Sequence, residues 1–381
     1  MYSISGYGEM IGDTVRMSAY EEALRRSVKP GSVVVDIGTG TGIMAILACR
    51  FGARRVYAIE PDDVIQVARQ IAADNGFSDR IEFIQDISTQ VELPEPADVI
   101  VSDLRGVLPF FRHHLEAIVD ARQRLLAPGG TLIPGRDRVW ATLVEMPEAY
   151  QTRVRPWGDN HYGFNLGAAT RFLTNSWTKQ IAREEQILVE PQCCSTLDYY
   201  TADSLNSNCS LTWTASRPGV AHGLCVWFDT DLIEGVGFSN APGGTQAIYG
   251  NAFFPWSEPI EISPGDTILV GLHADLVGED YIWRWSISVR DSEQAAPRVR
   301  MEQSTFFGIP LSPAHLRKRA GGYVPRLNDD GLIDSSILQS MNGDVSLNEI
   351  AGSVLEKFPK RFKTLKDALT HVGELSKKYS G

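Results

Sequence analysis

The chain has 381 residues, of which 43% are hydrophobic and 22% charged, the balance of an ordinary globular protein with two or three domains. Its formal net charge of −11 disfavours nucleic acid as a partner, and its apolar stretches are of strand length, too short to span a membrane. The first ten residues lack the basic and apolar regions of a secretory signal, so we expect a cytoplasmic protein. The five cysteines include no CxxC pair, which predicts free thiols and no metal site.

The region from about Val15 to Ile133 alternates strand-like apolar runs with amphipathic helical patterns. The apolar runs are 33–37, 56–59, 81–84, 99–102 and 131–133, and the helical patterns are 43–51, 61–75 and 111–126. This alternation is typical of a doubly wound parallel sheet. We therefore predict an α/β, Rossmann-like domain over residues 1–138.

A glycine-rich turn follows the first of these strands, where residues 33–42 read VVVDIGTGTG. A buried strand that enters such a turn and then a helix lets the backbone approach a ligand closely. The glycines follow GxGxG and not the GxGxxG of dinucleotide-binding turns, and Asp36 precedes the first glycine, Gly38, by two positions. An acid at this place opposes a pyrophosphate and suits a cationic ligand.

Acidic residues also follow the next two strands. Glu60 is placed to accept hydrogen bonds from two ribose hydroxyls, and Asp86, with Ile87 beside it, is placed to meet an adenine edge. Together with Gly38 and Gly40, these residues predict S-adenosylmethionine, a nucleoside with an amino-acid tail and a sulfonium but no phosphate. A structural glycine turn in another α/β enzyme and a nicotinamide dehydrogenase are the alternatives.

The pattern changes at Trp140 and stays changed until about Pro310. Runs of β-branched and aromatic residues, broken by Gly, Pro and Asn, occupy 221–228, 267–272 and 281–289. Such runs are typical of antiparallel strands. We predict an antiparallel β domain over residues 139–315.

Several of these motifs resemble the protein arginine methyltransferases over about the first three hundred residues. Residues 10–16 (MIGDTVR) match the family's N-terminal helix that folds over the cofactor, and DIGTGTG and AIE match its cofactor loop and ribose acid. The resemblance implies that Met10 lies by the sulfonium and that Arg16 binds the cofactor carboxylate. It also implies a β-barrel after the catalytic domain, a dimerisation arm near 165–186, and hence a homodimer.

The acceptor side departs from the pattern of that family. The family grips a guanidinium with two glutamates nine residues apart on one loop, whereas this chain has Asp103 at the first position and Arg112 at the second. The family's threonine-histidine-tryptophan loop corresponds to 248–251 (IYGN), where Tyr249 lies and the histidine and tryptophan are both absent. Because a cation at contact distance opposes a guanidinium, we predict an acceptor other than arginine.

The loop that would face the transferred methyl group is rich in hydrogen-bond donors. The planar fork of an arginine matches a carboxylate or phosphate, and His113 or His114 could act as base for a hydroxyl or amine nucleophile. We predict catalytic roles for Asp103, Arg112 and His113 and substrate contacts for Arg105 and Tyr249. Alternatively, one arginine and one histidine lie on the solvated face of the helix over 111–126 and have no role in the site.

A basic connector, 316–322 (LRKRAGG), leads to a last region that we predict to be a small helical domain over 322–381. It combines a short strand at 324–328, helical patterns at 335–341, 346–358 and 365–376, and a capping box at Ser346 to Glu349. This order resembles the winged-helix domain of the pyrroloquinoline-quinone biosynthesis protein D type. The resemblance implies capture of the leader of a ribosomally made precursor peptide by strand addition, while an ordinary winged helix or a packing cap is the alternative.

The sequence as a whole predicts an S-adenosylmethionine-dependent methyltransferase with the architecture of the arginine methyltransferases. Its predicted acceptor is a non-arginine group in a peptide or a peptide-derived natural product. Two alternatives stand: an arginine methyltransferase with a rebuilt pocket, and a catalytically silent relative that binds a peptide. Over residues 322–381, eight basic side chains balance eight acidic ones, which disfavours DNA as the partner of the tail.

Overall fold

The computed structural model describes residues 3–158 and 161–380. The chain divides into two units, Met1–Pro310 and Leu311–Gly381, each with an apolar core of its own. The outer limits of the predicted first and last domains, residues 1, 2 and 381, lie outside the described residues.

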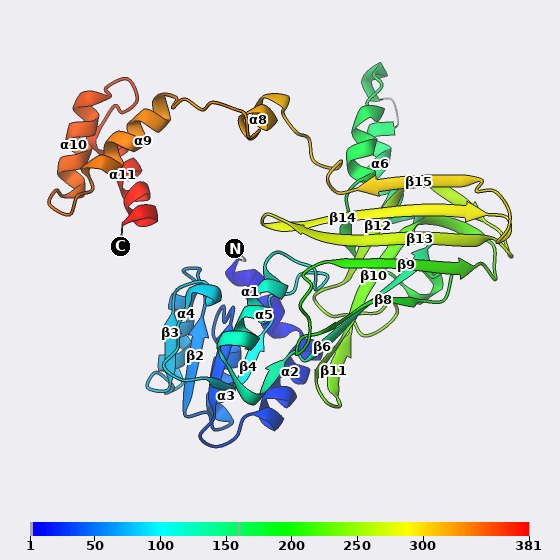
Figure 1. Cartoon of the computed structure of the whole chain (residues 1–381), viewed down its shortest axis with the longest axis horizontal. Coiled ribbons are helices and arrows are strands. Elements are labelled where there is room, and N and C mark those ends of the chain that lie inside the picture. The colour runs from blue at the N-terminus through cyan, green and yellow to red at the C-terminus, as the bar shows by residue number, and fades with distance from the viewer. Residues whose placement is uncertain (1–2, 159–160, 381) are drawn as a thin grey trace. The chain divides into compact units, whose positions relative to one another are not determined.

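A five-stranded parallel sheet in the order β3-β2-β1-β4-β5 forms the first part of unit 1 (Figure 1). Its strands are β1 Val33–Ile37, β2 Arg55–Ile59, β3 Ile81–Ile84, β4 Ala97–Ser102 and β5 Leu126–Ile133, and the helices between them are α3 Ile43–Arg50, α4 Ile65–Asp74 and α5 His114–Arg124. Every residue of β1 is buried, as is usual for a parallel strand covered on both faces. The predicted Rossmann-like sheet is confirmed.

Two helices precede this sheet, α1 Ile4–Gly12 and α2 Thr14–Ser27. Asp13 lies between them, and one of its carboxylate oxygens caps α2 by accepting from the Arg16 backbone N–H at 3.1 Å. The other oxygen accepts from the backbone N–H of Ile248 at 2.7 Å. One side chain therefore ties the N-terminal helices to a loop more than two hundred residues away.

Two antiparallel sheets form the rest of unit 1. The first has the order β7-β12-β10-β6-β8 with β11 paired to β10, and the second has the order β15-β14-β13-β9. The strands are β6 Arg136–Val144, β7 Thr178–Gln180, β8 Gln192–Asp198, β9 Ser207–Thr214, β10 Gly219–Ile233, β11 Val236–Ser239, β12 Asn251–Ile262, β13 Thr267–Val277, β14 Asp280–Arg290 and β15 Val299–Ser304. The predicted antiparallel region is confirmed, and a closed barrel stays a prediction.

Helices α6 Pro147–Gly158 and α7 Thr170–Thr174 are inserted between β6 and β7, and α6 projects from the strands (Figure 1). This insertion overlaps the arm predicted near 165–186. It exposes apolar side chains, since Trp157, Phe164 and Leu166 are 40%, 67% and 36% exposed. Such exposure is typical of a segment that packs against another surface.

Unit 2 contains α8 Pro313–Lys318, α9 Asp329–Ser340, α10 Leu347–Lys357 and α11 Leu365–Tyr379. Ile337, Ala351, Val372 and neighbouring apolar residues form its core. The capping box at Ser346 and Glu349 is confirmed, because each side chain accepts from the backbone of the other.

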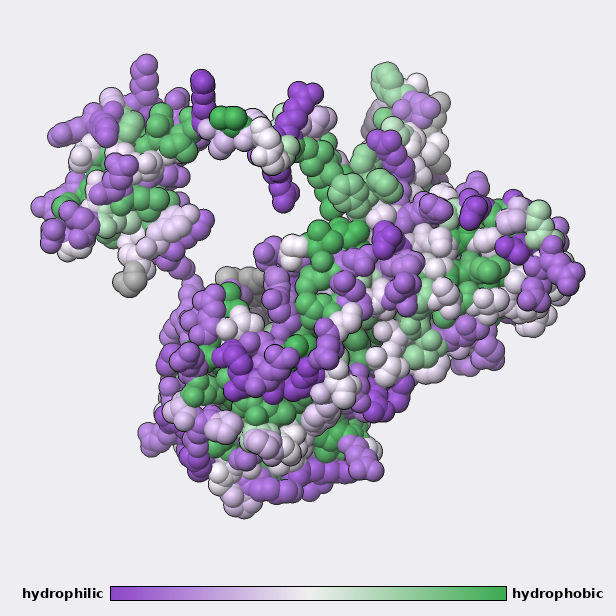
Figure 2. All heavy atoms as spheres, viewed as in Figure 1, coloured by the Kyte–Doolittle hydropathy of each residue, from purple (hydrophilic) through white to green (hydrophobic). Residues whose placement is uncertain are grey.

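The short strand predicted at 324–328 is wrong, since the structure assigns no strand to that segment. Pro325 has no N–H to donate to a ladder, and the Asn328 side chain accepts from the Gly331 N–H at 2.9 Å to begin α9. Figure 2 shows apolar residues in the segment between α8 and α9, where Val324 and Leu327 are exposed. No helix among the described residues is long and apolar enough to cross a membrane.

Candidate functional site

The glycine turn after β1 is the first element of the candidate site. Gly38, Gly40 and Gly42 have φ angles of 72°, 54° and 86°, a region that side chains with a Cβ rarely adopt. A Cβ on Gly40 would collide with the ring of Tyr7 from α1, and one on Gly38 would collide with the side chain of Leu104. The turn is therefore closed from two directions, by the first helix and by the loop after β4.

The Asp36 side chain holds this turn in place through hydrogen bonds. Its side chain is buried, and its Oδ2 accepts from the Thr39 hydroxyl at 2.5 Å and from the Ala45 backbone N–H at 3.1 Å. Burial raises the pKa of Asp36 to about 7. The structure thus assigns Asp36 a role in holding the turn, whereas the sequence placed it beside a cationic ligand.

Glu60 ends β2 next to the same turn. Its carboxylate accepts from the Gly40 backbone N–H at 3.1 Å and from the Asp62 backbone N–H at 3.1 Å, and burial raises its pKa. At the end of β3, Asp86 and Ile87 are exposed, and the Asp86 carboxylate accepts from the Ile87 N–H at 2.7 Å. The carboxyl ends of these strands share one edge of the sheet, where open α/β folds bind ligands.

Arg16 connects the cofactor side to the acceptor side. It is buried on α2, and it donates from Nη1 to the Met10 carbonyl at 3.2 Å. Its Nε donates to the Asp103 carboxylate at 2.6 Å and to the Tyr249 hydroxyl at 3.2 Å. The structure therefore brings together four predicted site residues that are as far apart as 239 positions in the sequence.

Asp103 lies at the centre of this cluster, with its side chain 9% exposed. It accepts from Arg16, from the Tyr249 hydroxyl at 2.6 Å and from Arg105 Nε at 3.1 Å. Burial alone would raise the pKa of Asp103, but the two guanidinium groups outweigh it and hold the pKa at about 2. Asp103 is thus ionised, and its charge already faces two cations.

Arg105 is fully enclosed, with a side-chain exposure of 0%. It donates to Asp137 and Thr230, both at 2.9 Å, and to the Tyr20 hydroxyl at 2.6 Å. Its guanidinium also lies 5.0 Å from the centre of the Phe228 ring. This enclosure corrects the predicted substrate contact of Arg105, because its donors are engaged within the chain.

Arg112 and His113 lie on the surface at the start of α5. Arg112 has a φ of 44°, rare for a residue with a side chain, and its guanidinium lies 5.3 Å from the Phe111 ring centre. Within the described ranges of the chain, Arg112 makes no ion pair. His113 bonds to Glu279 at 3.0 Å and to Glu116 at 2.7 Å, which raises the pKa of its ring.

The His113 contacts predict a small, pH-dependent stability effect. A raised pKa in the folded state gives stability that is present below the unfolded value of 6.5 and is lost as the pH rises through the folded value. We expect His113→Gln to lower the melting temperature by about 1–3 °C near pH 6 and to leave it unchanged near pH 9. Glu279→Gln removes one of the same contacts and should show the same pH dependence in scanning calorimetry; a loss independent of pH would contradict this account.

Sequence reasoning missed the buried residues that support Arg105. The Tyr199 hydroxyl donates to Asp137 at 2.6 Å and lies 3.0 Å from His114 Nε2, and burial lowers the pKa of His114 to about 3. His114 is therefore a neutral core residue. A signal existed in β6, because Asp137 occupies the same alternating face as the buried Val139, Ala141 and Leu143.

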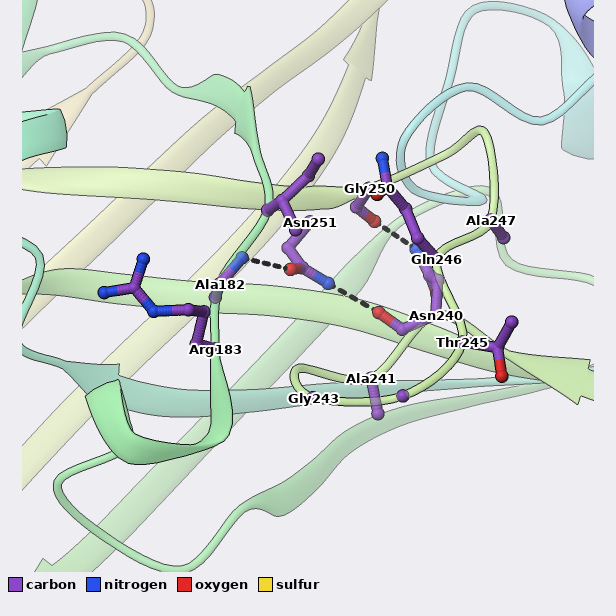
Figure 3. A pocket seen from close by; sticks show the side chains of 12 residues that line it. Ala182, Arg183, Asn240, Ala241, Gly243, Thr245, Gln246, Ala247, Gly250 and Asn251 are labelled. Atoms are coloured by element: carbon purple, nitrogen blue, oxygen red, sulfur yellow. Dashed lines mark hydrogen bonds between the residues drawn. The ribbon is translucent and has the colours of Figure 1, made fainter.

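The loop between β11 and β12, which carries Tyr249, is held by two buried asparagines (Figure 3). Asn251 accepts from the Ala182 N–H at 2.9 Å and donates to the Asn240 carbonyl at 2.5 Å, while the Asn240 amide donates to the Gly250 carbonyl. A cavity of about 200 Å³ lies against this loop and is also lined by Arg183. Because the asparagine amides are engaged in these bonds, they position the loop.

These features fit S-adenosylmethionine. The backbone of the glycine turn is free of side chains of its own, α1 covers it, and acids at Asp36 and Glu60 oppose a phosphate at this edge of the sheet. A ribose, which has two hydroxyls to donate, suits the Glu60 carboxylate at this edge.

Comparisons with known proteins agree with this geometry. The model of the ribosomal protein L11 methyltransferase family matches residues 13–134, and that of the arginine methyltransferase oligomerization subdomain matches residues 136–275. The structure is similar to that of Arabidopsis thaliana protein arginine methyltransferase 10, with a TM-score of 0.70 and 22% identity over 80% of this chain and 98% of that one. It is also similar to a Trypanosoma brucei PRMT1 enzyme-prozyme heterotetrameric complex with AdoHcy, with a TM-score of 0.69 and 24% identity over 78% and 97% of the two chains.

Sequence relatives point the same way. An arginine N(omega)-methyltransferase of Streptomyces achromogenes subsp. streptozoticus is 30% identical over 69% of this chain and 74% of its own length. Protein arginine N-methyltransferase 1 of Dictyostelium discoideum is 27% identical over 68% and 78%. A probable protein arginine N-methyltransferase 6 of Arabidopsis thaliana is 30% identical, and the match spans 53% of that relative. The chain belongs to the family of the protein arginine methyltransferases (PRMT) and is an S-adenosylmethionine-dependent methyltransferase.

Proposed function

We propose that this methyltransferase acts on an acceptor other than arginine, one that presents an anionic group. The observation that carries the proposal is the charge around Asp103, which already faces Arg16 and Arg105, while Arg112 stands exposed where the family has its second acid. A guanidinium needs negative charge for binding, whereas an arginine side chain without an ion pair suits a carboxylate or phosphate. We propose a peptide or a peptide-derived natural product as the class of acceptor.

On the cofactor side, Glu60 and Asp86 would hold the nucleoside, with Ile87 against the base, and Gly38 and Gly40 would admit its backbone contacts. Arg16 and Met10 would face the amino-acid tail and the sulfonium, and Asp36 holds the turn. Bound S-adenosylmethionine supplies a methyl group on a good leaving group. The residues of the chain therefore contribute mainly orientation and exclusion of water, to which α1 is suited because Tyr7 covers Gly40.

On the acceptor side, Asp103 and Tyr249 would lie nearest the methyl group, and Arg112 would hold the acceptor's anionic group. His113, which we propose as the base, would first have to release a proton shared with Glu279 or Glu116. The pH profile of methyl transfer should therefore rise to a pKa above 6.5.

Relatives named as arginine methyltransferases favour a second candidate function, arginine methylation through a rebuilt pocket. Mass spectrometry of products from arginine-bearing peptides, free arginine and matched carboxylate-bearing acceptors separates the two. Rapid methylation of arginine alone would contradict the proposal. Methyl transfer to any acceptor would exclude a catalytically silent peptide-binding protein.

Arg112→Glu restores the charge pattern of the family at the second acidic position. If Arg112 holds an anion, the change places like charges in contact and should abolish activity on a carboxylate-bearing acceptor, a loss of at least about a hundredfold in kcat/KM. Arg300→Glu makes the same charge change at an exposed position of strand β15 and is the control. Retained turnover in Arg112→Glu would make Arg112 an ordinary surface residue.

We propose that unit 2 holds a peptide partner, as the domain of the pyrroloquinoline-quinone biosynthesis protein D type does, but not by strand addition, because the described residues of unit 2 contain no strand. Support comes from its separate core and from the exposed apolar side chains of Val324 and Leu327. Deleting residues 322–381 should leave cofactor affinity intact and raise KM far more for a full-length peptide than for its core fragment, because the tail contributes effective concentration. Insolubility of the truncated chain would instead indicate a packing cap, and unchanged kinetic parameters would contradict docking.

We propose that the chain forms a homodimer through the α6 and α7 insertion. The support is its exposed apolar surface at Trp157, Phe164 and Leu166, together with the match to an oligomerization subdomain. Light scattering should give twice the chain mass of 42.0 kDa, and Trp157→Glu with Phe164→Glu should shift it to a monomer.

A further inference from the structure

We propose that Arg105 is a specificity-determining residue that sets the charge preference of the acceptor site by neutralising Asp103 from inside the fold. The inference rests on the proposed place of Asp103 beside the acceptor. Arg105 itself never touches the acceptor, since its side chain is 0% exposed. It acts through the one carboxylate that this chain keeps on its acceptor loop.

The contact is direct. Arg105 Nε donates to Asp103 Oδ1 at 3.1 Å, while Asp103 Oδ2 accepts from Arg16 and from the Tyr249 hydroxyl, both at 2.6 Å. Both oxygens are therefore engaged, one of them by Arg105 alone. A guanidinium acceptor would compete with an internal guanidinium for Oδ1 and would meet a carboxylate that two cations already face.

Arg105 is fixed in this position. Asp137 on β6 and Thr230 on β10 accept from its Nη1, and its Nη2 donates to the Tyr20 hydroxyl on α2. Its guanidinium carbon also lies 5.7 Å from the centre of the Phe238 ring and 5.8 Å from that of Tyr249. Elements from both parts of unit 1 thus hold the cation in place, and it cannot swing aside to admit a charged ligand.

Asp137 must be changed together with Arg105, because the two form a buried ion pair. It is also 0% exposed, so removing Arg105 alone would leave a buried carboxylate without its cation. The pair Arg105→Met with Asp137→Asn removes both charges and keeps side chains of similar size. The amide oxygen that this second substitution introduces can still accept from the Tyr199 hydroxyl, which donates to Asp137 at 2.6 Å. Asp103, Arg16 and Arg112 remain unchanged in this double variant.

The experiment measures binding of arginine amide and of citrulline amide by calorimetry, with S-adenosylhomocysteine present. The two probes have nearly the same shape and differ in charge, so the ratio of their affinities reports the charge preference of the site. We expect the ratio to favour arginine amide at least about tenfold more in the double variant than in the native protein. A general loosening of the structure would weaken both probes and leave the ratio unchanged.

Two single variants are the controls. Arg105→Lys keeps a cation beside Asp103, and Asp137→Asn keeps Arg105 while removing the more distant carboxylate, so neither should gain preference for arginine amide. A folded double variant with native affinity for S-adenosylhomocysteine and an unchanged ratio would overturn the inference. If the double variant does not fold, Arg105→Met with Asp137→Leu replaces both charges by apolar side chains and has the same expected result.

Failure of the inference and failure of the proposed function give different results. If the native protein methylates arginine, the proposal of a non-arginine acceptor fails, but the ratio still compares native and variant proteins. If the native protein rejects arginine and the ratio does not change, Arg105 is not the cause of that rejection.

Discussion

Glu60→Ala is expected to weaken the binding of S-adenosylmethionine at least about tenfold. Glu60 ends β2, and its carboxylate already orients the turn by accepting from the Gly40 N–H. With the nucleoside bound, it would accept from two ribose hydroxyls, and hydrogen bonds to a charged group contribute about 1.5–3 kcal/mol each. Loss of both contacts exceeds the roughly 1.4 kcal/mol that corresponds to a tenfold change in affinity.

Calorimetry on the purified protein measures this effect, with circular dichroism to show that the variant is folded. Glu82→Ala is the matched control, because Glu82 lies on the adjacent strand β3 and its exposed side chain forms an ion pair with Arg55 on β2 at 2.6 Å. Glu60→Gln should fall between Ala and the native protein, since it keeps an acceptor oxygen without the charge. Native affinity in Glu60→Ala would remove Glu60 from the cofactor site.

The parallel sheet was predictable because its signals are local. The strand β1 and its turn follow from five consecutive apolar or buried positions and from three glycines whose positive φ angles the turn requires. The predicted strands at 33–37 and 81–84 match β1 and β3 residue for residue. In contrast, β6 pairs with β8 and β10, partners more than fifty residues away, and no local pattern specifies that order.

The candidate site was predictable residue by residue but not as a network. Motifs identified Arg16, Asp103 and Tyr249 separately, but they did not predict that these side chains bond to one another. The ion pair between Arg16 and Asp103 spans 87 positions of the sequence. Arg105 was predicted to contact the substrate because it lies on the acceptor loop, two positions after Asp103. Its burial depends on Asp137, which is 32 positions away and whose side chain the fold turns inward.

The ion pair between Arg105 and Asp137 predicts a large, non-additive effect on stability. Arg105→Met alone should lower the free energy of unfolding by about 3–5 kcal/mol, because it leaves the Asp137 carboxylate buried without a cation. Arg105→Met with Asp137→Asn should recover most of this loss, since no charge then remains to be compensated. A double-mutant cycle in urea, with Asp137→Asn as the second single variant, measures the coupling.

The pH dependence of that loss tests its electrostatic origin. Burial already raises the pKa of Asp137, and removal of Arg105 should raise it further. In Arg105→Met, Asp137 can then take up a proton in the folded state as the pH falls, and a protonated carboxyl has no charge to compensate. The difference from the native protein should therefore shrink as the pH falls from the alkaline to the acidic side of neutrality. A difference that stays constant over this range, or single losses that simply add in the cycle, would show that packing and not charge makes this pair matter.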